Sequence, residues 1–288
     1  MTHSAGSFVV RDGISIAYAL HTESRSEGLP ARPRIALIHS LALDQSIWDG
    51  AVPLLTGHAD VLTYDCRGHG KSGRPKMKFT PELFAADLAG LLDHLGWPSV
   101  TLAGCSMGGC VAQAFAGISP DRVQALALID TTAWYGESAP KDWRERAGTA
   151  AAKGFQALSG FQATRWVSDA FRQAHPEVIR AKMDIFLAND IDCYTATCEM
   201  LGDADLRHYQ PDMRMPTSVI VGEEDYAAPV AMSEQIERAL PNATLSILPK
   251  VRHLTPIECP DVIADKILAL MERAGVTSDT TAAPIAGR

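Results

Sequence analysis

A serine between glycines is the residue of this sequence that points most directly to chemistry. Ser106 lies in Gly104-Cys-Ser-Met-Gly108, between an apolar run typical of a buried strand and a run typical of a helix start. A residue at the tip of so sharp a turn has a strained backbone, and only glycine or a very small residue fits two positions to either side. The turn would raise the Ser106 hydroxyl above the sheet and aim the Met107 N–H at the same point, as a nucleophile and an oxyanion donor require.

A serine hydroxyl is a weak nucleophile until a base takes its proton, and that base is a histidine oriented by a carboxylate. His253 follows the strand predicted to end near residue 249, and Gly222-Glu-Glu-Asp225 follows the preceding predicted strand. Because parallel strands end at the same edge of a sheet, we expect both loops to meet Ser106. The order serine, acid, histidine along the chain accompanies this kind of elbow. The spacing alone leaves all three carboxylates of residues 222–225 open as the acid.

The elements that must position these groups alternate between strand and helix. A hairpin is predicted around Asp12-Gly13, and Asp44 and Thr80 are predicted to cap the first two helices. Buried strands are predicted at residues 34–39, 60–65, 99–105, 123–130, 216–222 and 244–249, with helices between them. This alternation indicates an α/β protein whose parallel sheet is covered on both faces.

The alternation stops after the fourth of these strands. From residue 133 to residue 207 only helical periodicity is found, for example at 143–153, 155–166 and 176–187. We interpret 1–132 and 208–274 as two parts of one core, and 133–207 as a helical cap over the end of the sheet that carries Ser106. Residues 275–288 are small and polar and are predicted to form a disordered tail.

Composition excludes several classes of function. The 288 residues carry a net charge of −8 without a basic stripe, which argues against nucleic acid as a partner. No apolar run is long enough to span a bilayer, and the first residues lack the pattern of a signal peptide, so no membrane partner is expected. The expected partner is a small-molecule substrate, and self-association into a homo-oligomer is left open.

Six cysteines are present, and none forms a C-x-x-C pair. They are predicted to be free thiols in a reducing, cytoplasmic compartment. Cys105, next to the elbow serine, is the alternative nucleophile, but its side chain would point into the strand side of the turn. No cluster has the spacing of metal ligands, so neither a metal nor an organic cofactor is expected.

Several motifs together resemble the α/β-hydrolase family along almost the whole chain. They are Ile38-His39-Ser40-Leu41, Asp65-Cys-Arg-Gly-His-Gly-Lys-Ser-Gly73, Gly104-Cys-Ser-Met-Gly-Gly109, Gly222-Glu-Glu-Asp225 with Pro229, and His253 with Glu258 and Pro260. The resemblance implies a mostly parallel, doubly wound sheet with an inserted helical cap. It selects Asp225 as the acid, with Asp130 as the alternative used by some members. It makes the N–H groups of Leu41 and Met107 the oxyanion donors, and a serine nucleophile argues against the dehalogenase and epoxide hydrolase members.

Within that family the chain is most similar to the 3-oxoadipate enol-lactonases. The similarity includes Ser40-Leu-Ala-Leu-Asp-Gln-Ser-Ile-Trp48 and, in the cap, Arg165-Trp-Val167, Tyr194-Thr-Ala-Thr-Cys-Glu199 and Asp205-Leu-Arg207. Substrates of this group are small lactones that bear a carboxylate. The resemblance therefore implies a cation in the pocket, for which Arg165 is a candidate, and aromatic walls, for which Trp134 and Trp166 are candidates. Each of these three could instead be an ordinary packing residue of the cap.

The sequence thus predicts a carboxylic-ester hydrolase with the triad Ser106, Asp225 and His253. Its expected substrate is a small lactone, resembling an enol-lactone and open to a carboxylate substituent, or an ester, in the breakdown of aromatic compounds. A hydrolase of C–C bonds in ring-cleavage products, and a cofactor-free perhydrolase, are alternative enzymes. A ligand receptor that keeps the hydrolase pocket is the alternative from another class.

Overall fold

The computed structural model describes residues 2–23 and 31–276, and within them the chain forms one eight-stranded sheet. The strand order is β1-β2-β4-β3-β5-β6-β7-β8. Pairing is antiparallel from β1 through β2 to β4 and parallel across the rest of the sheet. The predicted α/β class with a mostly parallel sheet is confirmed. The proposed tail at 275–288 falls almost wholly outside the described residues.

The strands lie close to their predicted positions. They are β1 (Thr2–Val9), β2 (Ser15–Thr22), β3 (Arg34–Ile38), β4 (Asp60–Tyr64), β5 (Val100–Cys105), β6 (Val123–Ile129), β7 (Thr217–Gly222) and β8 (Ala243–Leu248). The predicted hairpin is formed by β1 and β2. Every residue of β5 and β7 is buried, as expected of central strands covered on both faces.

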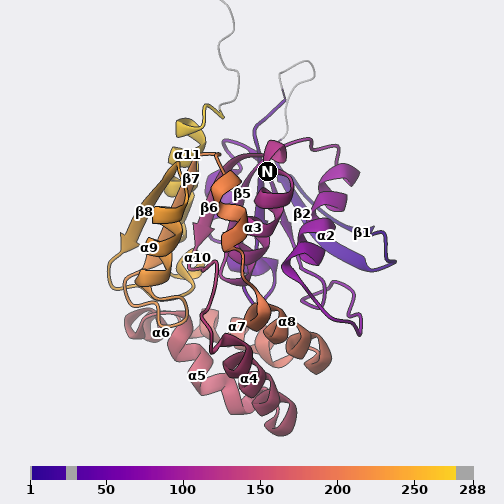
Figure 1. Ribbon diagram of the computed structural model, residues 1–288, viewed down its shortest axis with the longest axis vertical. Helices are drawn as coiled ribbons and strands as arrows, with labels where there is room; N and C mark the ends of the chain where they lie inside the picture. Colours follow the sequence, from indigo (N-terminus) through magenta and orange to yellow (C-terminus); the bar gives the residue numbers. More distant parts are fainter. Residues whose placement is uncertain (1, 24–30, 277–288) are drawn as a thin grey trace, which may run out of the picture.

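Helices cover both faces of the sheet. The helices α2 (Pro81–His94), α3 (Met107–Ile118) and α9 (Val230–Ala239) lie on the face toward the viewer in Figure 1. The other face carries α1 (Val52–Leu55) and α11 (Pro260–Arg273), and α10 (Thr255–Glu258) comes just before α11. Thr80 caps α2 by accepting a hydrogen bond from the Leu83 N–H at 3.1 Å, as predicted.

The first predicted helix is divided in two. Asp44 accepts from the Ser46 N–H and begins a 3₁₀ helix, η1 (Gln45–Trp48), and α1 starts only at Val52. Two further 3₁₀ helices are η2 (Pro120–Arg122), just before β6, and η3 (Arg207–Asp212), just before β7. Asp44 is therefore a cap as predicted, but of a shorter and tighter helix.

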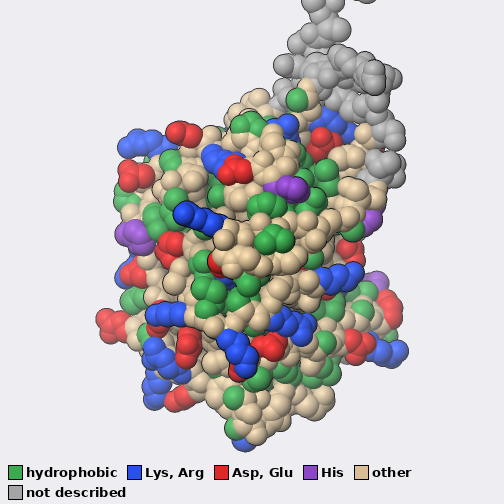
Figure 2. All heavy atoms as spheres, turned by 90° about the vertical axis from the view of Figure 1, so that its right-hand side faces the viewer, with side chains coloured by type: hydrophobic (Ala, Val, Ile, Leu, Met, Phe, Trp, Pro, Cys, Tyr) green, Lys and Arg blue, Asp and Glu red, His purple; other side chains and the backbone are tan. Residues whose placement is uncertain are grey.

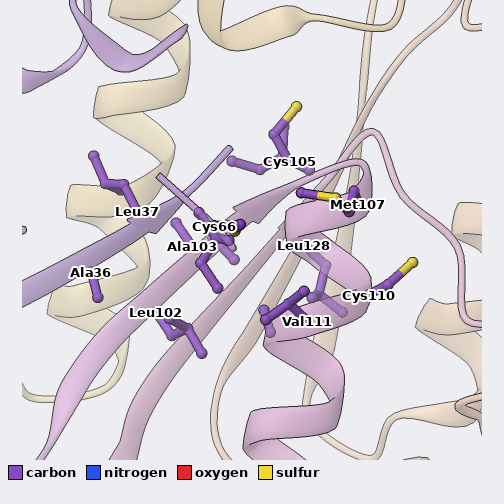
Figure 3. Close-up of a cluster of buried hydrophobic side chains, with 14 of the residues drawn as sticks. Ala36, Leu37, Cys66, Leu102, Ala103, Cys105, Met107, Cys110, Val111 and Leu128 are labelled. Atoms are coloured by element: carbon purple, nitrogen blue, oxygen red, sulfur yellow. The ribbon is translucent and has the colours of Figure 1, made fainter. Parts of the chain in front are cut away.

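The core around the elbow is formed by the central strands and α3. Ala36 and Leu37 of β3, Leu102 of β5 and Val111 of α3 pack in one apolar cluster (Figure 3). Because these side chains are fully buried, the end of β5 and the start of α3 are held rigidly beneath Ser106.

Five helices between β6 and β7 gather at one end of the sheet, at the bottom of Figure 1. They are α4 (Ala139–Lys153), α5 (Gln156–Trp166), α6 (Asp169–Ala174), α7 (Pro176–Leu187) and α8 (Ile191–Asp203). We call them the cap. An isolated antiparallel bridge joins Trp134 to Asp205 where the chain enters and leaves this segment.

Surface charge is mixed in sign. Lys and Arg side chains alternate with Asp and Glu over the face shown in Figure 2, with small apolar areas between them. Among the described residues, no helix has both the length and the apolar character needed to cross a bilayer.

Candidate active site

The elbow at Ser106 has the backbone that its glycines predict. Ser106 has φ 56° and ψ −116°, a conformation that side-chain-bearing residues seldom adopt. A Cβ on Gly104 would lie 2.1 Å from the Gly108 carbonyl oxygen, and a Cβ on Gly108 would lie 2.4 Å from the Ile38 carbonyl oxygen. Both neighbours are backbone atoms, so the turn requires glycine at these two positions.

Ser106, His253 and Asp225 form a continuous row of hydrogen bonds. Ser106 Oγ lies 2.9 Å from His253 Nε2, and His253 Nδ1 lies 2.8 Å from Asp225 Oδ2. The other oxygen of Asp225 accepts from the N–H groups of Ala227 at 2.7 Å and Ala228 at 2.9 Å. All three side chains of the row are buried. The structure therefore brings together the three residues that the sequence singled out, and fixes the carboxylate so that one oxygen faces the imidazole.

Asp130, the alternative acid, has other partners. Its Oδ2 accepts from the N–H and hydroxyl of Thr255 at 2.9 and 2.7 Å, and its Oδ1 accepts from the Gly222 N–H at 3.2 Å. Burial, reinforced by the nearby charge of Asp225, raises the pKa of Asp130 well above its ordinary value. Asp130 thus joins the end of β7 to the start of α10, and the carboxylate that is hydrogen-bonded to His253 is that of Asp225.

The segment from Ser40 to Leu43 forms a turn beside Ser106, with the Leu43 N–H 3.4 Å from the Ser40 carbonyl. His39 holds the turn from below, because its Nδ1 lies 2.7 Å from the Ser40 carbonyl oxygen and its Nε2 accepts from the Cys66 N–H at 2.9 Å. A carbonyl can only accept, so the proton of neutral His39 is on Nδ1.

The N–H groups of Leu41 and Met107 donate no hydrogen bond to other protein groups in the described part of the chain. Leu41 lines the cavity that contains Ser106 and His253, whereas the Met107 side chain is fully buried. Two free N–H groups at these positions, one at the start of α3, are what a developing negative charge requires.

A cavity lies between the cap and the triad residues. It holds about 30 Å³ and adjoins an outer cavity of about 370 Å³. The inner cavity is lined by Ser40, Leu41, Ser106, Tyr135, Trp143, Arg146, Gln162, Arg165, Trp166, Ala227 and His253. Five of these residues also line the outer cavity, so the two cavities are adjacent: Tyr135, Trp143, Arg146, Arg165 and Ala227.

The three cap residues singled out by the sequence have different positions. Arg165 and Trp166 line the inner cavity. Trp134 is not among the residues that line this cavity. Its ring is covered by the Arg207 guanidinium, 3.8 Å from the ring centroid, and its backbone forms the bridge to Asp205 at the base of the cap. An aromatic residue just after a strand can line the substrate pocket or pack at the base of the cap, and the sequence does not distinguish these two positions.

Sequence reasoning missed a second cation in the cavity, Arg146 of α4. Its Nε donates to the Tyr194 hydroxyl at 2.8 Å, and its guanidinium lies 5.0 Å from the Trp143 ring centroid. Neither Arg146 nor Arg165 forms an ion pair with a carboxylate in the described part of the chain. Burial, followed by the neighbouring charge of Arg146, lowers the pKa of Arg165 from its ordinary value. Two unneutralised guanidinium groups therefore share one cavity.

The thiols near the elbow lack the features of nucleophiles. Cys105 is fully buried, and burial raises the pKa of its thiol well above the ordinary value, with Asp130 and Asp225 adding to the effect. Burial raises the pKa of Cys110 to about 11. Both thiols are protonated near neutral pH and pack against the elbow (Figure 3). Within the described residues, no three His, Cys, Asp or Glu side chains are arranged to hold a metal ion.

Comparison with known proteins shows the family of this chain. A family model described as "alpha/beta hydrolase fold" matches residues 33–177, which is half of the chain. This chain belongs to the α/β-hydrolase family. The predicted family and fold are thereby confirmed, and the eight-stranded sheet with a helical segment before β7 agrees with both.

Relatives include lactonases and esterases. The 3-oxoadipate enol-lactonase 2 of Acinetobacter baylyi is 29% identical over 246 residues, which cover 85% of this chain and 91% of that protein. The crystal structure of the enol-lactonase from Burkholderia xenovorans is 32% identical, with a TM-score of 0.87 over 93% of this chain and 100% of that one. A malate-bound esterase from Thermogutta terrifontis is 27% identical, with a TM-score of 0.84 over 94% and 99% of the two chains.

Proposed function

We propose that the protein is a serine hydrolase that opens a small lactone, or an ester, bearing a carboxylate. The observation that carries the proposal is the row from Ser106 through His253 to Asp225 beneath a cavity that contains two unpaired guanidinium groups. The names of the relatives support the coarser class of carboxylic-ester hydrolase, since they include enol-lactonases and an esterase. The carboxylate is inferred from the arginines of this chain.

The first step is attack by Ser106. His253 Nε2 takes the hydroxyl proton as Oγ forms a bond to the substrate's carbonyl carbon. His253 Nδ1–H donates to Asp225, whose negative charge stabilises the imidazolium that results. The carbonyl oxygen becomes an oxyanion, and the N–H groups of Leu41 and Met107 stabilise it without having to reorganise.

The second half of the cycle returns the enzyme to its starting state. When the tetrahedral intermediate collapses, the bond to the ring oxygen breaks and that oxygen takes the proton from His253. The substrate remains attached to Ser106 as an ester. Water then gives a proton to His253 and attacks the acyl carbon, and collapse of this second intermediate returns the proton to Ser106 Oγ. One water is consumed, and the product carries a new carboxyl group.

The two arginines set the expected charge of the substrate. A partly buried cation without a counter-charge is unfavourable, and a bound carboxylate would supply that counter-charge to Arg165 and Arg146. Arg146 is held by Tyr194, whereas the Arg165 guanidinium lies 4.8 Å from the centroid of the Phe161 ring. Trp143 and Trp166 line the same cavity and provide apolar walls for a flat ring.

The test combines a nucleophile variant with a pair of substrates that differ in charge. Purified protein and Ser106→Ala are assayed against carboxylate-bearing enol-lactones, aryl esters and ring-cleavage products. Loss of nearly all turnover in Ser106→Ala is expected, and full turnover in that variant would overturn the proposal. Arg165→Met should raise KM about tenfold or more for a lactone with a free carboxylate, and little for its methyl ester. The control is Arg144→Met, because Arg144 is surface-exposed and paired with Asp203.

The same assay separates the alternatives. Turnover of ring-cleavage products without lactone opening would indicate a C–C bond hydrolase. Tight binding of a lactone with no turnover by the unaltered protein would indicate a receptor. Either result would replace the lactonase assignment.

A further inference from the structure

The turn that carries Leu41 contains an unfavourable backbone conformation. Ala42 has φ 59°, in the left-handed region. It occupies the third position of the turn from Ser40 to Leu43, where turns with a positive φ favour glycine or asparagine because a Cβ is disfavoured. Ala42 is fully buried, so the turn cannot be stabilised by exchanging its hydrogen bonds with bulk water. Something in the surrounding protein must hold it.

A cap residue makes that contact. Asn189 lies two residues beyond the end of α7, and its Nδ2 donates to the Ala42 carbonyl oxygen at 2.8 Å. The same Nδ2 lies 3.1 Å from the Ile185 carbonyl and 3.0 Å from the Phe186 carbonyl, so its two hydrogens are shared between the end of α7 and the turn. The turn is thus held at Ser40 by His39 of the core and at Ala42 by the cap.

We propose that Asn189 is a positioning residue that keeps the Leu41 N–H in place for the oxyanion by fixing the Ala42 carbonyl. It acts through the turn and touches no reacting atom. The inference rests on the proposed function, in which Leu41 is an oxyanion donor. A donor of this kind stabilises a transition state only when it is already oriented, so loosening the turn lowers kcat rather than substrate affinity.

A second contact from α7 supplies the matched control. Lys182 Nζ donates to the Ser46 carbonyl at 2.8 Å and to the Ser46 hydroxyl at 2.6 Å. Like Asn189, Lys182 joins α7 to the core, but its contact lies beyond the turn, in η1. A variant at Lys182 therefore weakens the docking of α7 without releasing Ala42.

The experiment is a double-mutant cycle between Asn189→Ala and Ala42→Gly, measured with p-nitrophenyl acetate, a simple activated ester. Asn189→Ala should lower kcat about tenfold or more, with KM changed less than about threefold. Asn189→Ala should also weaken the binding of phenylboronic acid by a similar factor, because that compound forms a tetrahedral adduct with a reactive serine. In the Ala42→Gly background the loss in kcat should fall below about threefold, because glycine adopts a positive φ without support. Lys182→Met should lower Tm and change kcat less than about threefold.

Three results would overturn the inference. The first is a kcat for Asn189→Ala within about twofold of the unaltered protein. The second is a loss of kcat on Asn189→Ala that is equal with Ala42 and with Ala42→Gly. The third is a loss of kcat in Lys182→Met equal to that in Asn189→Ala. Asn189→Asp, which keeps the side-chain shape and removes both donors, repeats the cycle if Asn189→Ala does not fold. Failure of the proposed function has a separate signature, since Ser106→Ala would then retain its turnover.

Discussion

At the scale of single residues, the loops beside Ser106 rest on two fully buried histidines, His39 and His69. Their ring centroids are 5.2 Å apart. Burial lowers the pKa of His39, and it lowers the pKa of His69 to about 3, with His39 contributing. Both side chains are therefore neutral at neutral pH, and protonating His69 in particular would place a charge in the core with no acidic group beside it among the described residues.

We predict that these histidines make the protein sensitive to mild acid. Below the ordinary histidine pKa of about 6.5 the unfolded chain binds protons that the folded chain does not, so the free energy of unfolding falls as pH falls from about 6.5 toward about 3. Each such histidine contributes a slope of about 1.4 kcal/mol per pH unit. Urea unfolding at several pH values should show a shallower slope for His69→Asn. The exposed His58→Asn is the control, and equal slopes in the two variants would contradict the prediction.

Residues at strand ends were predictable, and residues brought in by helix packing were not. Ser106, Asp225 and His253 follow three strands of one parallel sheet, and the parallel arrangement alone puts them at one edge. Arg146 lies in the middle of α4, and its place above Ser106 depends on how α4 packs against α8. Hydrophobic periodicity predicts that such a helix exists, but not which side of it faces the substrate.

At the scale of elements, the junction of β5 and α3 tolerates no side chain at Gly104. We predict that Gly104→Ala lowers the free energy of unfolding by about 3 kcal/mol or more, or prevents folding, because its Cβ would overlap a backbone oxygen that cannot move. Gly148→Ala is the matched control. Gly148 lies inside α4 with no atom within 4 Å of its Cβ position, so alanine there should stabilise the protein by about 0.5–1 kcal/mol. Thermal unfolding measures both, and equal effects would contradict the argument.

The strands were easier to predict than the connections between them. Continuous apolar runs between turn signals put each of the six strands from β3 to β8 within a residue or two of its observed bounds, whereas β1 and β2 extend further from the Asp12-Gly13 turn than their short alternating runs indicated. The segment after Asp44 was predicted as one helix because its apolar residues recur with a helical period. The helix is interrupted between η1 and α1. The Asp44 side chain accepts a hydrogen bond from the Ser46 N–H, and the turn that follows closes as a 3₁₀ helix.

At the scale of the whole molecule, the cap is bonded to the same loop that carries His253. Glu258 accepts from the Ser168 N–H of the cap at 3.0 Å and from the Arg252 N–H at 3.1 Å. The Leu254 N–H donates to the Trp166 carbonyl at 2.7 Å. Cap and core are therefore expected to unfold together.

We predict that in Glu258→Ala the cap unfolds locally while the core stays folded. The substitution leaves two N–H donors without an acceptor, at a cost of about 1–3 kcal/mol each, and that cost falls on the contact between cap and core. Hydrogen exchange followed by mass spectrometry should show the peptides of α5 and α6 losing protection in this variant while those of β5 keep theirs. Glu234→Ala, on the exposed side of α9, should leave the pattern unchanged. A uniform loss of protection across the chain would refute the prediction.

The bridge at the base of the cap brings together the two ends of the segment between β6 and β7. Trp134 pairs with Asp205, and the Leu206 N–H donates to the Ala133 carbonyl at 2.9 Å, so the two points of attachment are neighbours in space. An insertion whose two ends are neighbours can be accommodated without moving the strands that it connects. Substitution of this cassette as a unit could give the same nucleophile a new substrate, without any change in the sheet beneath it.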